Sequence, residues 1–382
     1  MEPLLLRLSE PRELLALVPH LLGFQPRDSA VAVSLRGPRG RVGLVARVDL
    51  ADVADAVHGP QVARSLAAHL DRDGARRVAL VVYARDAPGS GERVAAAAAH
   101  TLEAFDVPFG GADVLVVGDT TFRCLACDPT CCPPTGHPLS ALQGTRAGAE
   151  MVLAGSVVAA GREQLAEVRA ASADARRAVA RVRRRRCEAR ARARVAGPQH
   201  LARWRADSLA AWRALVAAPA GAGAGRVTRI ALLGRVEAGL ADRRVRDAVL
   251  VACLPGAGTL PERALALAGP DEDAEVRAAV GRLVDPAGCV APGDGARTAA
   301  AVLEEVLAHG RRGAQAPAST LLAAIAWWRG DGARAAVLLE RALQDDPGYR
   351  LGHLLRAAVE AGLAPGWARR QEAGGGVVAG VT

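Results

Sequence analysis

The 382-residue sequence contains no lysine and no asparagine, so all 49 of its basic residues are arginine. A bias this complete indicates a GC-rich bacterial genome, and it makes an abundance of arginine weak evidence for function. Aromatic residues are only 3% of the chain, so buried cores must be built from Ala, Leu and Val. With 51% hydrophobic residues, a chain of this length can form the cores of two domains.

Long apolar runs are also missing. No run approaches the roughly 20 residues that a membrane-spanning helix needs. The N-terminal sequence MEPLLLRLSEPREL interrupts its leucines with charged residues, unlike the continuous core of a signal peptide. We therefore expect no membrane association and a cytoplasmic protein, in which cysteines are usually reduced.

The net charge of +9 is confined to one segment. Residues 176–194 hold ten arginines and one glutamate, which gives +9 and leaves the rest of the chain neutral. A nucleic-acid site would use the centre of this run, namely Arg183, Arg184, Arg185 and Arg186. No interleaved aromatics accompany the run, so a solvated helix or a strut between domains is the favoured interpretation.

The first third of the chain alternates strand and helix patterns. A helix is expected over 11–22, with Pro19 as a kink or an early end. Strands at 30–35 and 42–48 form a hairpin, and a helix at 61–72, a strand at 78–83, a helix at 92–105 and a strand at 113–117 follow. A last short strand is expected at 120–125. This alternation predicts a small mixed sheet with βαβαβ crossovers in an α/β domain of residues 1–137.

A cysteine-rich junction, FRCLACDPTCCPPTG at 122–136, ends this domain. Cys124 and Cys127 have the spacing of half a zinc site, which Cys131, Cys132 or His137 would complete. A second separated cysteine pair is missing, however. The adjacent Cys131 and Cys132 would also suit a vicinal disulfide or a redox-sensing pair. The favoured interpretation is a rigid proline-rich turn that buries small thiols.

A second candidate site lies where the parallel strands end. Ligands bind beyond the carboxyl ends of strands in open α/β sheets. This edge would collect Asp49, Arg85, Asp86 and Asp119, together with the loop glycines Gly89 and Gly91, whose backbone N–H groups would face an anion. The loop lacks a P-loop lysine and the full G-x-G-x-x-G pattern, so an ordinary crossover loop is favoured.

A third set of polar residues flanks the first hairpin. Asp28 and Ser29 would hold the turn before the first strand through side-chain-to-backbone hydrogen bonds. Arg47 and Asp49 lie two residues apart on a strand, hence on one face, where they would pair with neighbours. Structural use of all four residues is favoured over ligand binding.

The rest of the chain is expected to be helical. We divide it into an Arg-rich helical connector at 138–219, an all-α domain at 220–370 and a disordered tail at 371–382. The segment 330–347 fits the second helix of a tetratricopeptide-type hairpin, with Ala335, Leu339 and Ala342 on its inner face. Tetratricopeptide-like hairpins are therefore expected at 316–363, although only one repeat is recognisable.

The segments LLALVPHLLGFQPRDSAVAV, RVDL, CDPTCCPPTG and GDGARAAVLLERALQDDPGY occur in this order along the chain. Their combination resembles an actinobacterial family, the domain of unknown function 4192, over nearly the whole chain. The resemblance implies a bacterial cytoplasmic setting and carries no activity with it. Cys124 and His137 depart from the family pattern. The residues that match it are Gly23, Phe24, Pro26, Asp28, Ser29, Arg47, Asp49, Cys127, Cys131, Cys132 and Gly136.

Three functions are compatible with these patterns. No Gly-x-Ser-x-Gly or His-Glu-x-x-His motif occurs, so the leading hypothesis is a non-enzymatic binding or adaptor protein with a protein partner on its C-terminal helices. The second is an enzyme or small-ligand sensor at the carboxyl edge of the strands. The third is nucleic-acid binding through the Arg-rich helix. Zinc at the cysteine junction is the one cofactor considered.

Overall fold

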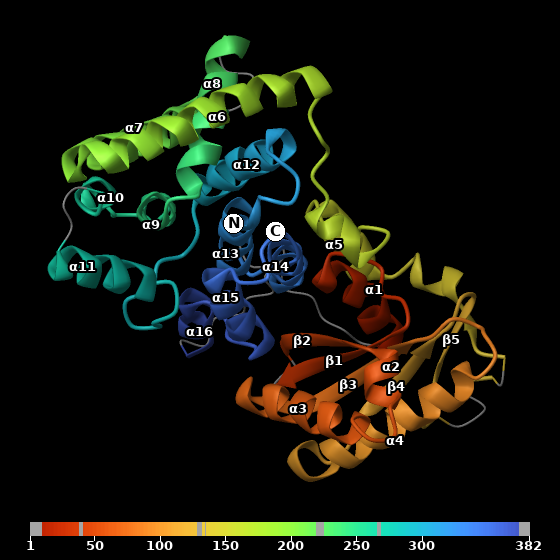
Figure 1. Ribbon diagram of the computed structural model, residues 1–382. Coiled ribbons are helices and arrows are strands. Elements are labelled where there is room, and N and C mark those ends of the chain that lie inside the picture. Colours follow the sequence, from red (N-terminus) through yellow and green to blue (C-terminus); the bar gives the residue numbers. More distant parts are fainter. Residues whose placement is uncertain are drawn as a thin grey trace. The chain divides into compact units, whose positions relative to one another are not determined.

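The computed structural model describes residues 10–37, 41–127, 132–133, 135–218, 225–265 and 269–373 (Figure 1). These residues divide into two compact units, an α/β unit that ends at Leu165 and a helical unit that begins at Ala166. The expected class, a mixed sheet with helices followed by an all-helical region, is confirmed. Residues 138–219, expected as a connector, are divided between the two units. Residues 38–40 of the expected hairpin, residues 219–224 and the expected tail beyond 373 lie outside the described residues, whereas residues 371–373 of that tail are helical.

The described part of the α/β unit contains the following helices and strands in chain order: α1 (Pro11–Leu22), β1 (Ser29–Arg36), β2 (Arg41–Asp49), α2 (Leu50–Ala54), α3 (Gly59–Arg72), β3 (Ala75–Tyr83), α4 (Ser90–Phe109), β4 (Asp113–Val117), β5 (Thr121–Cys124), β6 (His137–Pro138), η1 (Leu139–Leu142), α5 (Arg146–Leu153) and, at the boundary, η2 (Arg162–Ala166).

The sheet has the strand order β2-β1-β3-β4-β5-β6. β1 is antiparallel to both β2 and β3, whereas β3 and β4 are parallel, so β2, β3 and β4 all run in one direction. The crossover from β2 to β3 therefore passes over β1, and the crossover from β3 to β4 joins neighbours. As a result the carboxyl ends of three strands meet the start of β1 at a single edge of the sheet.

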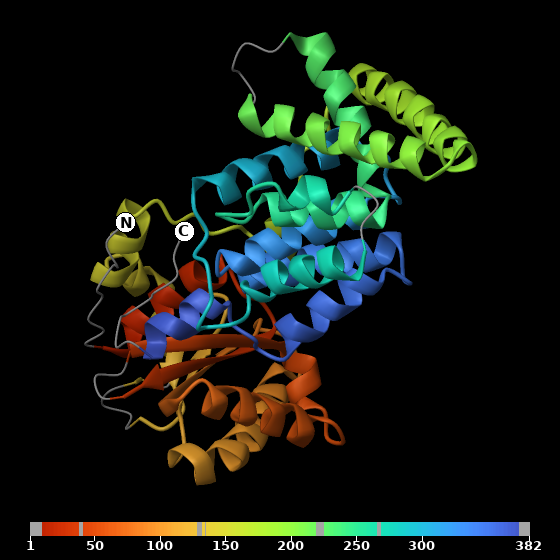
Figure 2. The same cartoon turned by 90° about the vertical axis from the view of Figure 1, so that its left-hand side faces the viewer.

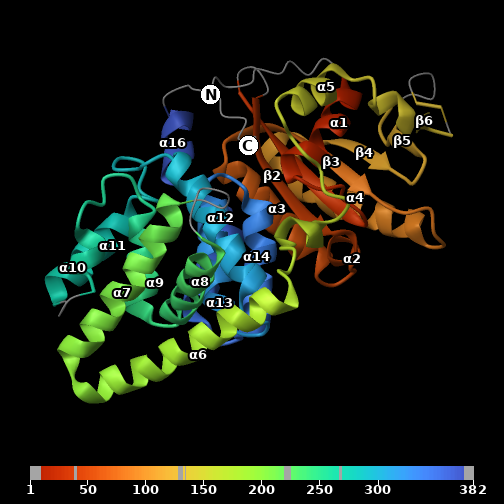
Figure 3. The same cartoon turned by 90° about the horizontal axis from the view of Figure 1, so that it is seen from above.

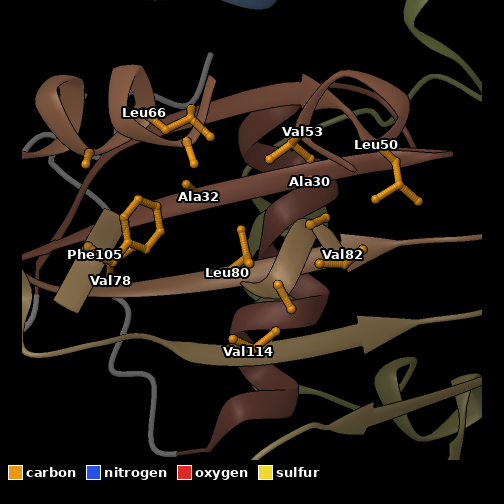
Figure 4. Packing of buried hydrophobic residues seen from close by; sticks show 14 of the residues in the cluster. Ala30, Ala32, Leu50, Val53, Leu66, Val78, Leu80, Val82, Phe105 and Val114 are labelled. Carbon is orange, nitrogen blue, oxygen red and sulfur yellow. The ribbon is translucent and has the colours of Figure 1, made fainter. Parts of the chain in front are cut away.

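Helices cover the two faces of the sheet. α2, α3 and α4 lie on one face, and α1 and α5 lie on the other (Figures 1 and 2). The α2–α4 face holds a fully apolar core in which Leu80, Val82 and Val114 of the strands meet Leu66 of α3 and Phe105 of α4 (Figure 4). These strands read as nearly continuous Val, Leu and Ala runs because both faces of the sheet are buried.

α1 continues through Pro19 to Leu22, so the expected early end does not occur. The helix ends at Gly23, which has a φ of +76° and forms the left-handed cap that favours glycine. Phe24 then pairs as an isolated bridge with Ala159. The N-terminal helix is in this way connected to the segment that follows α5.

The described part of the helical unit contains α6 (Ala173–Ala196), α7 (Pro198–Ala217), α8 (Arg226–Leu240), α9 (Arg243–Ala252), α10 (Leu260–Arg263), α11 (Pro270–Gly281), α12 (Asp294–His309), α13 (Ala316–Trp328), α14 (Gly332–Asp345), α15 (Arg350–Glu360) and α16 (Gly366–Ala373).

α13 is the centre of this unit. Twelve of its thirteen residues are buried, and it packs against α12, α14 and α15. The expected turn at Gly330 and Asp331 is present: Gly330 has a φ of +91°, and the Asp331 carboxylate caps α14 by accepting the Arg334 N–H at 2.9 Å. Ala335, Leu339 and Ala342 are fully buried, as the hairpin pattern predicts. The likeness to tetratricopeptide repeats stays a prediction.

Among the described residues, every helix is too short or too polar to reach across a lipid bilayer.

Candidate functional site

The carboxyl edge of the sheet, meaning the ends of β2, β3 and β4 together with the start of β1, gathers the residues predicted there. Ser29 of β1 pairs with Asp49 on one side and with Tyr83 on the other. Directly opposed residues of antiparallel strands share a face, so these three side chains form a row. The adjoining loops add Asp28, Arg85, Asp86 and Asp119.

Asp28 and Arg85 form an ion pair across β1 and β3, with Arg85 Nη2 2.6 Å and Nε 2.7 Å from the same carboxylate oxygen. Asp28 has a φ of +42°, the only positive φ at a non-glycine residue in the described chain, and Asp tolerates this conformation better than most residues. Its backbone carbonyl accepts the Leu50 N–H at 2.9 Å. Desolvation raises the pKa of Asp28, but Arg85 outweighs it and the net pKa is lowered.

The neighbouring group is made by Ser29, Arg47 and Asp49. Arg47 donates from Nε to the Ser29 hydroxyl at 2.8 Å and from Nη2 to the Asp49 carboxylate at 2.6 Å. The Ser29 hydroxyl donates in turn to the Arg27 carbonyl at 2.6 Å, which is the turn-holding bond that the sequence predicts. The pairing of Arg47 with Asp49 also follows the spacing argument. These bonds fix the geometry of the hairpin at the edge.

Asp86 and Asp119 are joined by a hydrogen bond between the backbone of one and the side chain of the other. The Asp119 carboxylate accepts the Asp86 N–H at 3.0 Å. Gly118, which follows β4, lies beside the Asp86 side chain, and a Cβ on Gly118 would lie 3.0 Å from an Asp86 carboxylate oxygen. The β3 and β4 loops are therefore held against each other, and both aspartates remain exposed.

The glycine loop leads directly into α4. Gly89 has a φ of +75° and is the N-cap of α4, and no side chain caps this helix end. A Cβ on either Gly89 or Gly91 would meet nothing within 4 Å, so the loop is open to solvent. Free backbone N–H groups at a helix start favour anions.

Tyr83 belongs to the same row and was missed by the sequence reasoning. Its ring is buried, its hydroxyl has no hydrogen-bond partner among the described residues, and burial raises its pKa. In sequence Tyr83 is the last residue of an apolar strand, which is a normal place for a core aromatic. Only the cross-strand register places it beside Ser29.

Arginine neutralises two of the four aspartates at the carboxyl edge. Asp28 and Asp49 each pair with an arginine, and Asp119 accepts a backbone N–H. The pKa of Asp28 is lowered, mainly by Arg85, so this carboxylate stays ionised at neutral pH. A general acid at neutral pH needs a raised pKa. The arrangement is suited to recognising charged groups.

The cysteine junction is described only in part. The Cys124 N–H lies 3.5 Å from Cys132 Sγ, and both of these cysteines are free thiols. Cys131 lies outside the described residues. In the part of the chain that the structure describes, no three His, Cys, Asp or Glu side chains are placed to hold a metal ion.

The arginines of α6 divide between two faces. Three point into the helical unit: Arg183 pairs with Glu237 at 3.2 Å, Arg186 donates to the Trp204 carbonyl at 2.8 Å, and Arg190 pairs with Asp242 at 2.8 Å. Of the four predicted contacts to nucleic acid, only Arg184 and Arg185 are exposed. The inward side of α6 is therefore only partly exposed, and the outward side is the solvated one.

Comparison with known proteins gives one result. The family described as Domain of unknown function (DUF4192) matches residues 11–284, with a second match at 261–366. The chain belongs to this family. The matches span both the α/β unit and most of the helical unit. No curated protein and no solved structure matches the chain significantly.

Proposed function

We propose that this member of the DUF4192 family is a non-enzymatic binding protein of the bacterial cytoplasm. Its α/β unit recognises an anionic group of a small ligand at the carboxyl edge, and its helical unit serves a protein partner. The alternative, an enzyme that uses Asp49 and Asp119 of the same edge as acid, base or metal ligands, has less support because both carboxylates already carry structural hydrogen bonds.

The observation that carries the proposal is the pair of Asp28 and Arg85. The Arg85 side chain is 67% exposed and directs both of its contacts to one oxygen of Asp28, whose side chain is 30% exposed. A phosphate or carboxylate can therefore replace Asp28 as the partner of the guanidinium without leaving a buried charge unpaired. The uncapped start of α4 adds free N–H groups at the same edge.

The proposed surface for a protein partner is α15. It packs on both helices of the α13–α14 hairpin, and Gly352 is its one buried residue. Leu354 is 59% exposed on this helix. An exposed leucine on an amphipathic helix is the kind of anchor that helix-in-groove recognition uses.

The anion site is tested by calorimetric titration of inorganic phosphate into four proteins. Arg85→Gln should weaken binding about tenfold or more, because a charge-assisted hydrogen bond is lost. Asp28→Asn should strengthen it by up to about fivefold, because Arg85 is released from an exposed ion pair. Asn also tolerates the positive φ of position 28.

The matched control is Arg77→Gln. Arg77 pairs with Asp113 at 3.0 Å in an exposed ion pair at the start of β3 and β4, which is the opposite edge of the same strands. Phosphate binding by this variant should equal that of the unaltered protein. Equal weakening by Arg77→Gln and Arg85→Gln, or phosphate binding that ignores both Asp28 and Arg85, would overturn the proposal.

A further inference from the structure

α6 presents an outward face whose arginines have no structural task. Arg181, Arg184, Arg185 and Arg192 are exposed and make no ion pair in the described part of the chain. Their spacing places them on one side of the helix. The opposite side carries the buried Ala175 and Val179 and the inward arginines described above. Figure 3 shows α6 and α7 diverging from the turn that joins them, and α6 contacts both α7 and α8.

The lack of acidic partners on this face contrasts with the rest of the protein. Some exposed arginines on other helices pair within one turn, as Arg146 does with Glu150 and Arg356 with Glu360. Between residues 178 and 194 the only acid is Glu188. Like charges three and four residues apart destabilise a helix, so the arginines of the outward face lower the stability of α6.

We propose that the outward face of α6 binds the phosphate backbone of duplex DNA without reading base sequence. Guanidinium groups match phosphate oxygens in a bidentate geometry. The four outward arginines span residues 181–192 of α6, which is about 16 Å at about 1.5 Å per residue, or about half of the roughly 34–36 Å turn of B-DNA. The rigid helix therefore presents its positive charge to a short run of phosphates. This surface is separate from the carboxyl edge, and the inference does not depend on the proposed function.

The absence of an accessible aromatic favours duplex over single-stranded nucleic acid. Single strands bind by stacking their bases on exposed aromatic rings. α6 contains no aromatic residue, and Trp204 beneath it is 4% exposed and covered by the guanidinium groups of Arg186 and Arg190. Contacts to phosphates alone position a protein on DNA but carry no sequence information.

The experiment is fluorescence anisotropy of a labelled DNA duplex about two helical turns long, titrated with the full chain at several salt concentrations. Four phosphate contacts predict a plot of log K against log salt with a slope of about −3.6, or about a hundredfold weaker binding at 200 mM than at 50 mM salt. Two duplexes of unrelated sequence should bind equally. A single strand of the same sequence should bind more weakly.

Two variants of the outward face test its role. R181Q/R184Q/R185Q/R192Q should lose most of the affinity and of the salt dependence, with a thermal midpoint that is no lower than that of the unaltered protein, because like charges on α6 are removed. The corresponding four Arg→Lys changes keep the charge and should retain binding. A matched control removes four other exposed arginines, all in the α/β unit: R64Q/R76Q/R77Q/R123Q.

Several results would overturn the inference. These are no binding of duplex by the unaltered chain, unchanged binding by the outward-face glutamine variant, and equal loss in the control. Tighter binding of the single strand than of the duplex would contradict the choice of ligand. Binding to heparin but not to DNA would show a general polyanion surface instead.

Discussion

Arg186 and Trp204 form two reciprocal hydrogen bonds, in which each side chain donates to the backbone carbonyl of the other residue. The Arg186 Nη2 donates to the Trp204 carbonyl at 2.8 Å, and the Trp204 indole Nε1 donates to the Arg186 carbonyl at 3.1 Å. The guanidinium also lies 5.0 Å from the centre of the indole ring. A residue from the most basic stretch of the sequence is thus part of the packing between α6 and α7.

Arg186→Gln should lower the free energy of unfolding of the helical unit by about 1–3 kcal/mol, because the buried Trp204 carbonyl loses a charged donor. Urea unfolding followed by tryptophan fluorescence measures this directly. All five tryptophans, Trp204, Trp212, Trp327, Trp328 and Trp367, lie in the helical unit, so the signal reports on that unit.

The control for this prediction is Arg184→Gln on the exposed side of the same helix. It should change the free energy of unfolding by no more than about 0.5 kcal/mol. If Arg184→Gln and Arg186→Gln were equally destabilising, the division of α6 into two faces would be incorrect.

Asp242 is the second internal partner of these arginines. Its carboxylate contacts Arg190 at 2.8 Å and Arg205 at 3.0 Å and caps α9 by accepting the Arg244 N–H at 3.1 Å. Its side chain is only 3% exposed. Desolvation raises the pKa of Asp242, but the two arginines outweigh this and the net pKa is lowered.

Because the pKa of Asp242 is lowered in the folded protein, this residue makes folding stability decrease as the pH falls. The stabilisation by Asp242 is fully present above the unfolded pKa of about 3.9 and is lost as the pH falls through the lower folded value. Asp242→Asn should cost about 3 kcal/mol at neutral pH, since Arg190 and Arg205 lose a buried partner. It should also flatten the loss of stability below about pH 4.

Thermal unfolding of the two proteins between neutral and acidic pH measures both effects. Asp207→Asn is the control, because the Asp207 side chain is 54% exposed and lies 3.6 Å from Arg186; its loss should cost less than about 1 kcal/mol. An acid profile of Asp242→Asn that paralleled the unaltered protein would contradict the assignment of the acid sensitivity to Asp242.

Gly136 is predicted to be intolerant of a side chain. It has a φ of +74°, and a Cβ there would lie 2.9 Å from the Phe122 carbonyl oxygen of β5. Gly136→Ala should therefore destabilise the α/β unit by about 1–3 kcal/mol. Gly91→Ala, where the new Cβ meets nothing within 4 Å, should be neutral or stabilising by up to about 1 kcal/mol. Circular dichroism melting of both variants tests the difference, and equal midpoints would contradict it.

The residues of the carboxyl edge could be predicted from sequence because each of them lies next to the end of a strand along the chain. Each strand is short and apolar, each is followed by its polar residues, and strands linked by helical crossovers run in one direction. The ion pair of Asp28 and Arg85 could not be predicted in this way, since 57 residues separate the two side chains. It exists because β1 inserts between β2 and β3, and no residue pattern specifies that strand order.

The two roles of the α6 arginines could not be predicted for the same reason. Arg183, Arg186 and Arg190 differ from their neighbours only in their partners, which lie 54, 18 and 52 residues away. A hydrophobic pattern of helical period would normally distinguish the inward face of α6 from its outward face. Here the inward face itself consists largely of arginine. A hydrophobic pattern cannot show burial that is achieved with charged side chains.

The most direct test of the account is one titration of p-nitrophenyl phosphate, a phosphate-bearing probe that becomes coloured when it is hydrolysed. The account predicts saturable binding that Arg85→Gln weakens and Arg77→Gln does not, with the probe recovered intact. Colour release in excess of the protein concentration that Asp49→Asn or Asp119→Asn abolishes would show an enzyme at this edge and contradict the account. Absence of any anion binding would contradict it equally.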